Sequence, residues 1–112
     1  MHEFALAQDI IETISNKVGE DLEKMTVIYI DVGEFSGVVT DSLEFGLTVC
    51  LQDRNLSHVK INMNSVPAAA VCECGVEYRI ADILDSCPNC QSLNRKITSG
   101  TDVIIRSLEL SG

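Results

Sequence analysis

Two stretches of the chain carry apolar residues at helical spacing. The first covers residues 3–18, and Gly19 follows it as a suitable helix end. The second begins at Thr40 or Asp41, and the spacing of Asp41 to Glu44 is similar to that of a capping box. The residues expected to face the core are Ala7, Ile10, Ile11, Ile14 and Val18 in the first helix, and Val39, Leu43, Gly46, Leu47, Cys50 and Leu51 in the second.

Three other stretches alternate between apolar and polar residues and predict strands. They cover residues 25–32, 58–65 and 102–110. A segment with four spaced cysteines, residues 71–97, lies between the last two and contains a short strand candidate at 76–80. The order predicts an α+β fold with two helices packed on one face of a three-stranded sheet and an inserted lobe. We expect one domain from residues 1–66 and 99–112, and a lobe from 67–98.

Composition narrows the possible functions. The formal charge of the 112 residues is −9 at pH 7, so the chain repels phosphate backbones and we expect no nucleic-acid partner. We find no apolar run of about 18–20 residues and no basic segment typical of a signal peptide, so we expect no membrane association and a cytoplasmic location. In that reducing compartment, five cysteines indicate metal ligands and one core thiol.

Four cysteines form two close pairs. Cys72 and Cys74 are separated by one residue, and after twelve residues Cys87 and Cys90 are separated by two. Two such pairs predict one tetrahedral zinc site in a zinc-ribbon-like lobe, although two redox pairs are an alternative. Four cysteine ligands leave no open position, so the zinc would be structural. A spacer of two residues is usual, so the first pair requires a tighter turn.

The amino terminus offers a second, different set of ligands. The Met1 amine, the His2 amide and imidazole nitrogens and the Glu3 amide can form a nitrogen square that suits Ni(II) or Cu(II). The first amides of a helix that begins near residue 3 have no intrahelical partner, so the metal would break no helical bond. A tail with a chance histidine is the alternative. We expect Cys50 to be a buried thiol and His58 a surface residue.

These features together resemble one known family. The HypA/HybF hydrogenase maturation proteins are similar over essentially the whole chain, in Met1-His2-Glu3, Val32-Gly33-Glu34-Phe35-Ser36-Gly37-Val38, Ser42-Leu43-Glu44-Phe45 and the paired cysteines. The resemblance implies a nickel metallochaperone rather than an enzyme, with Ni(II) as transient cargo on Met1, His2 and Glu3 of the α/β domain. It places structural Zn(II) on Cys72, Cys74, Cys87 and Cys90.

The resemblance also implies partners. Members work with the GTPase HypB to insert nickel into the large subunit of nickel-iron hydrogenase, and some also serve urease and its accessory proteins. Two other functions stay open from the residues alone. One is electron transfer, because the cysteine pairs are also similar to rubredoxin knuckles that hold iron. The other is a zinc-ribbon interaction module that delivers no metal.

Overall fold

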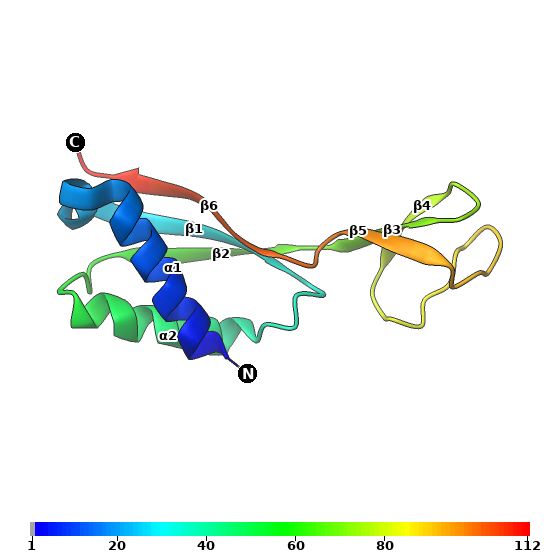
Figure 1. Ribbon diagram of the computed structural model, residues 1–112, viewed down its shortest axis with the longest axis horizontal. Helices are drawn as coiled ribbons and strands as arrows, with labels where there is room; N and C mark the ends of the chain where they lie inside the picture. Colours follow the sequence, from blue (N-terminus) through cyan, green and yellow to red (C-terminus); the bar gives the residue numbers. More distant parts are fainter. Residues whose placement is uncertain (1) are drawn as a thin grey trace. The chain divides into compact units, whose positions relative to one another are not determined.

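The structure, a computed structural model, describes residues 2–112 and divides them into two compact units (Figure 1). The helical unit contains the chain up to Ile30, Val38–Asn64 and Ile105–Gly112. The cysteine unit contains Asp31–Gly37 and Ser65–Ile104. The elements in chain order are α1 (Glu3–Val18), a 3-10 helix (Gly19–Lys24), β1 (Met25–Gly33), α2 (Thr40–Asp53), β2 (Lys60–Val66), β3 (Ala68–Cys72), β4 (Glu77–Ile80), β5 (Arg95–Ser99) and β6 (Val103–Leu110).

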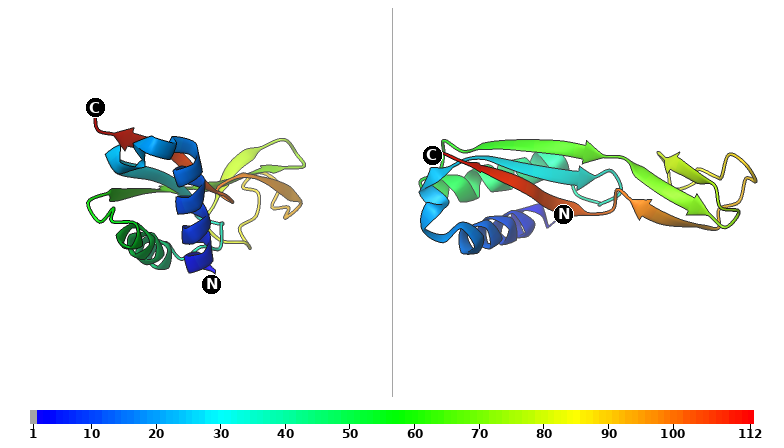
Figure 2. Two further views of the ribbon diagram at one scale, coloured as in Figure 1. Left: turned by 60° about the vertical axis from the view of Figure 1, so that its left-hand side comes forward. Right: turned by 90° about the horizontal axis from the view of Figure 1, so that it is seen from above.

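The sheet of the helical unit has the strand order β2-β1-β6. The N–H of Ser111 donates to the Lys24 carbonyl at 2.6 Å and that of Gly33 to the Asp102 carbonyl at 2.8 Å, which fixes β6 antiparallel to β1. Figure 2 shows β1 and β2 pointing the same way, and both helices on one face of the sheet. The predicted fold, two helices on a three-stranded sheet completed by the last strand, is confirmed.

Burial follows the predicted stripes with two exceptions, since Val18 is half-buried and Val39 is exposed. The core of the helical unit is mostly aliphatic and includes Ala7, Ile10, Ile11, Ile14, Met25, Ile28, Ile30, Leu43, Leu47, Cys50, Leu51, Leu56 and Val59. Gly46 belongs to it because a Cβ there would lie 3.1 Å from the Ala7 Cβ, so the glycine lets α2 approach α1 closely. Val39 is wrongly predicted as buried: it is 55% exposed, because it precedes α2 in extended backbone. No helix of residues 2–112 is long and apolar enough to cross a membrane.

The cysteine unit contains a second sheet, with the order β4-β3-β5 and antiparallel pairing. The expected short strand is present as β4, but β3 and β5 were not predicted. Three alanines open β3, and alanine has a weak preference for strands. Gly100 lies against the backbone at the start of this strand, because a Cβ on Gly100 would meet the Ala68 Cα at 2.5 Å. The small core consists of Ala68, Ala70 and Ile80, with Phe35, Tyr78 and Ile97 against it.

Candidate metal centres

The four spaced cysteines of the cysteine unit come together in space. Their sulfur atoms all lie within 4.8 Å of one another, with 3.5 Å between the Sγ atoms of Cys72 and Cys90 and 3.7 Å between those of Cys74 and Cys87. A regular tetrahedron with metal–sulfur distances of about 2.3 Å has sulfurs about 3.8 Å apart. The arrangement therefore fits a tetrahedral ion such as zinc, with cysteine at every corner.

The first cysteine pair sits on a tight turn between β3 and β4. The N–H of Cys72 donates to the Val76 carbonyl at 2.9 Å, and the N–H of Gly75 donates back to the Cys72 carbonyl at 2.9 Å. Gly75 has a φ of +94°, a conformation that glycine adopts without steric cost. This turn closes the pair with a single residue, Glu73, between its cysteines.

The second pair repeats the same design with one more residue. The N–H of Cys87 donates to the Ser92 carbonyl at 3.0 Å, and the N–H of Gln91 donates to the Cys87 carbonyl at 2.8 Å. Gln91, which follows Cys90 as Gly75 follows Cys74, has a φ of +60°. In both turns the residue after the second cysteine is left-handed. Each hydrogen bond of the first turn spans one residue fewer than its counterpart in the second turn. The first turn can therefore close with a single residue between its cysteines.

Backbone amides also point at the sulfurs. The N–H two residues after each cysteine donates to that sulfur, from Cys74 to Cys72, Val76 to Cys74, Asn89 to Cys87 (3.4 Å) and Ser92 to Cys90. The Val76 amide and the Asn89 side chain lower the pKa of the Cys74 thiol to about 6. At Cys72 the Cys74 amide acts the same way, but burial and the neighbouring sulfurs raise its pKa to about 12. The amides stabilise thiolate, the form that binds a metal.

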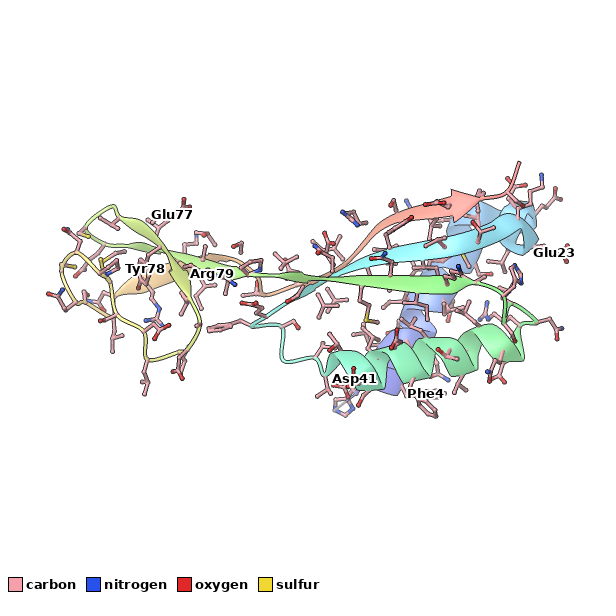
Figure 3. The ribbon with its side chains drawn as sticks, turned by 180° about the vertical axis from the view of Figure 1, so that it is seen from behind. Phe4, Glu23, Asp41, Glu77, Tyr78 and Arg79 are labelled. Carbon is pink, nitrogen blue, oxygen red and sulfur yellow. The ribbon has the colours of Figure 1, made fainter. Side chains whose placement is uncertain are left out.

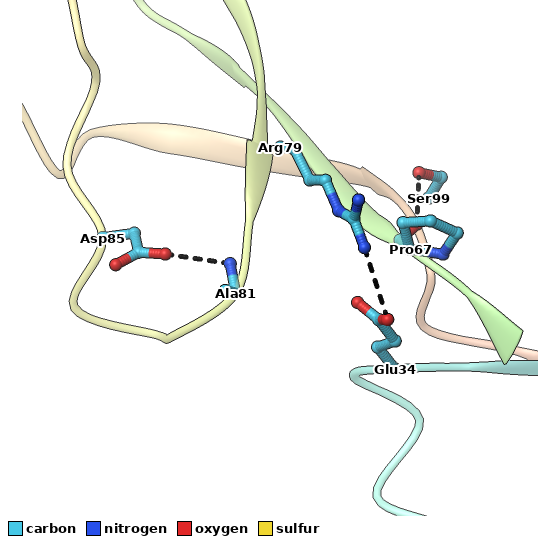
Figure 4. Close-up of polar contacts among 6 residues, drawn as sticks. All are labelled: Glu34, Pro67, Arg79, Ala81, Asp85 and Ser99. Carbon is cyan, nitrogen blue, oxygen red and sulfur yellow. Dashed lines mark hydrogen bonds and ion pairs between the residues drawn. The ribbon is translucent and has the colours of Figure 1, made fainter.

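A braced loop leads from β4 into the second cysteine pair (Figure 4). The Asp85 carboxylate accepts the N–H groups of Ala81 at 2.8 Å and Asp82 at 2.9 Å, and these amides hold the pKa of Asp85 below its usual range. Arg95, which pairs with Cys72 in the sheet, donates to the carbonyls of Asp85 and Ile83. These hydrogen bonds hold the backbone in place at Asp85, two residues before Cys87.

The amino-terminal candidates are only partly described. Met1 lies outside the described residues, so the predicted nitrogen square stays a prediction. His2 is exposed and immediately precedes α1, and its carbonyl accepts the Leu6 N–H at 2.9 Å. The helix begins at Glu3, as expected. The Glu3 amide therefore lies in the first turn, where no helical carbonyl is available to it.

The side chain of Glu3 has a role that the sequence did not reveal. It is 7% exposed, and its Oε2 atom accepts the backbone N–H of Val39 at 3.1 Å. Val39 is the N-cap residue of α2 and has no side-chain cap, so the capping box predicted from Asp41 and Glu44 is wrong. In a capping box, a carboxylate three residues into the helix accepts the N-cap amide. Here the carboxylate comes from α1 instead.

Neither of the two remaining candidates belongs to a cluster of metal-binding side chains among the described residues. Cys50 is buried, and burial raises the pKa of its thiol above the usual value. His58 is exposed, and its Nε2 atom lies 3.1 Å from the Met25 carbonyl oxygen. Within residues 2–112, the four cysteines are the one group of metal-binding side chains close enough together to share an ion.

The fold and the cysteine cluster define a small metal-binding α+β protein, and comparison with known proteins is consistent with this class. Residues 1–110 match the family described as "Hydrogenase/urease nickel incorporation, metallochaperone, hypA". Hydrogenase maturation factor HypA of Beijerinckia indica is 33% identical, over 98% of this chain and 99% of the relative. The Geobacter metallireducens factor of the same name is 28% identical over the same shares.

A solved structure shares the fold. The solution structure of the nickel metallochaperone HypA from Helicobacter pylori has a TM-score of 0.67 and 19% identity, and the match covers 99% of this chain and 98% of that one. The chain therefore belongs to the HypA family, which confirms the resemblance found from the sequence. It is a metallochaperone and hydrogenase maturation factor, not an enzyme.

Proposed function

We propose that this chain carries Ni(II) on its amino terminus and delivers it to the large subunit of nickel-iron hydrogenase. The ligands are the Met1 amine, the His2 amide and imidazole, and the Glu3 amide. The observation that supports this best is an exposed His2 directly before a helix that begins at Glu3. The imidazole is accessible, and the amides that complete the nitrogen set lie at the start of the helix, where amides are not used in its own i to i−4 hydrogen bonds.

Delivery follows from the exposure of this site. An acceptor can reach the ion and replace its ligands one at a time, because His2 is exposed. Binding displaces protons from the amine and the amides, so nickel affinity falls as the pH drops. In this ligand set Glu3 contributes its amide, and its Oε2 atom accepts the Val39 amide.

Zn(II) on Cys72, Cys74, Cys87 and Cys90 has a structural role in this proposal. The sulfur distances support a tetrahedral ion, and the unit's core of Ala68, Ala70 and Ile80 is small. In zinc-finger peptides the metal contributes on the order of 10 kcal/mol or more of folding free energy. The proposed nickel-binding domain is residues 1–66 and 99–112 and the proposed zinc-binding lobe is residues 67–98, which lies within the larger cysteine unit of Asp31–Gly37 and Ser65–Ile104.

The remaining parts of the proposal concern the cell. The proposed partners are the GTPase HypB and the hydrogenase large subunit, with urease accessory proteins as further recipients, all in the cytoplasm. The membership of the HypA family supports this setting, because that family is described by hydrogenase and urease nickel incorporation.

A nickel titration of a chain with a free amino terminus tests the function. We expect one Ni(II) per native chain and one zinc by elemental analysis. His2→Ala should abolish nickel binding and keep both the zinc and the helical signal in circular dichroism. His58→Ala is the matched control, since it removes the other exposed histidine. Nickel affinity equal to that of the native chain in His2→Ala, or a red iron-tetrathiolate in place of colourless zinc, contradicts the proposal.

A further inference from the structure

Two phenylalanines lie exposed beside the amino terminus of α1. Phe4 is 48% exposed and Phe45 is 71% exposed, and both line one shallow groove. The other lining residues are Glu3, Asp41, Ser42 and Gly46. The groove therefore runs between the first turn of α1 and the first half of α2. Figure 3 shows Phe4 and Asp41 on the side of α2 that faces away from the strands.

The fold brings these rings together by close helix packing. A Cβ on Gly46 would lie 3.4 Å from the Phe4 Cα and 3.5 Å from its ring carbon Cδ1. Gly46 directly follows Phe45. The close approach of α1 to α2 at this glycine therefore also brings the Phe4 and Phe45 rings beside one another along the same groove.

Aromatic side chains are scarce in this chain, and the two that are exposed line the same groove. The sequence has three phenylalanines, two tyrosines and no tryptophan. Phe35 and Tyr78 pack on the core of the cysteine unit, and Tyr29 contacts Glu109 and Arg106. The two remaining aromatic residues share the groove. Large exposed aromatic residues grouped in this way are typical of protein contact sites.

The surroundings of the groove are acidic. Asp41 lines it, and Glu44 lies exposed on the same helix, in a chain whose net charge is −9. A second copy of this chain would place acidic groups against acidic groups, which costs affinity. A partner with lysine or arginine around an apolar contact would instead be attracted.

We propose that the Phe4–Phe45 groove is the docking surface for the protein that accepts nickel, namely the hydrogenase large subunit, through an apolar contact bordered by basic residues. This rests on the proposed function, because the acceptor must bring its ligands to the ion. Phe4 is two residues from His2, so a partner that covers the groove also reaches the nickel site. The rings provide affinity, and Asp41 and Glu44 speed the encounter.

The test compares substitutions of exposed apolar residues inside and outside the groove. Phe45→Ser and Phe4→Ser remove groove rings, and Leu84→Ser is the matched control, because Leu84 is 75% exposed and belongs to the cysteine unit. Nickel affinity, zinc content and circular dichroism are measured first for each variant. Affinity for the purified nickel-free hydrogenase large subunit precursor is then measured by biolayer interferometry at two salt concentrations.

We expect Phe45→Ser to bind the precursor at least tenfold more weakly, with nickel affinity within twofold of the native chain. Leu84→Ser should bind normally, and Asp41→Asn should slow association most at low salt. Native precursor affinity in Phe45→Ser, or no measurable binding by the native chain, overturns the docking surface. So does a concentration-dependent dimer that Phe45→Ser abolishes. If the native chain does not bind nickel, the proposed function is refuted instead.

Discussion

The carboxylate of Glu3 accepts a hydrogen bond from the backbone N–H of Val39, 36 residues further along the chain. This contact joins the start of α1 to the start of α2. The Glu3 carboxylate therefore has a structural role, whereas nickel binding would use the Glu3 backbone amide. Because the two roles use different atoms of Glu3, substitution can separate them.

Glu3→Ala should destabilise the protein, because it leaves a partly buried N–H without its acceptor. The cost of such a group is about 1–3 kcal/mol, and each kcal/mol lowers the melting temperature of a domain this size by about 4–8 °C. Glu3→Gln keeps an acceptor oxygen and should cost less, with nickel affinity nearly unchanged. Thermal denaturation followed by circular dichroism measures the effect. His2→Ala is the control and should melt like the native chain.

Removal of zinc should unfold the cysteine unit and leave the helical unit folded. The cysteine unit has a small apolar core, whereas the helical unit has an extensive aliphatic one. Hydrogen exchange with a chelator present should show loss of protection across Ser65–Ile104 and persistent protection in α1 and α2. Equal loss of protection in both units would contradict a lobe held together by its metal.

Gly75→Ala should weaken zinc binding about tenfold. A Cβ at Gly75 meets nothing within 4 Å, so the penalty comes from its φ of +94° alone. The left-handed conformation costs a residue with a side chain about 1–2 kcal/mol, and 1.4 kcal/mol corresponds to tenfold. Competition with a chromophoric chelator measures the affinity.

Gln91→Gly is the matched variant at the equivalent position of the second turn. Glycine relieves the backbone there, so zinc should bind as tightly as in the native chain or slightly more tightly. If Gln91→Gly binds zinc more weakly than Gly75→Ala, the backbone conformation of the residue after the second cysteine does not determine zinc affinity in either turn.

Tyr29 should ionise at an unusually high pH. The hydrogen bond from its hydroxyl to the Glu109 carboxylate and burial raise its pKa above 10. Because the folded pKa exceeds the unfolded one, this contribution to stability is complete below about pH 10. It is lost as the pH rises from the unfolded value to the folded one. Tyrosinate absorbance should show a late-titrating component that Tyr29→Phe removes and Glu109→Gln shifts to lower pH.

The elements that the sequence predicted well are those with strong periodicity. The apolar spacing from Ala7 to Ile14 fits a helix and no strand. The alternation of apolar and polar residues in β1 and β6 fits a strand and no helix. β3 was missed because Ala68, Ala69 and Ala70 carry no strand signal of their own. Ala68 and Ala70 are buried with Ile80 in the small core of the cysteine unit, so the strand depends on packing with residues elsewhere in the sequence.

The cysteine cluster was predictable because spacing alone brings each pair together, and the structure adds only how the two pairs meet. The role of the Glu3 side chain was not predictable. Capping rules compare residues within one helix, and the partner of Glu3 begins another one. The groove formed by Phe4 and Phe45 was not predictable for the same reason. The two residues belong to different helices, and the close packing at Gly46 brings them together.

The single-residue spacer of the first cysteine pair has a consequence for how such centres are recognised in genomes. Both turns present an amide two residues after each sulfur and a left-handed residue after the second sulfur, whatever the spacer length. A search that requires two Cys-x-x-Cys strings passes over chains like this one, because only Cys87 and Cys90 have that spacing. A search that requires two chelating turns, each followed by a residue tolerant of positive φ, would retrieve them.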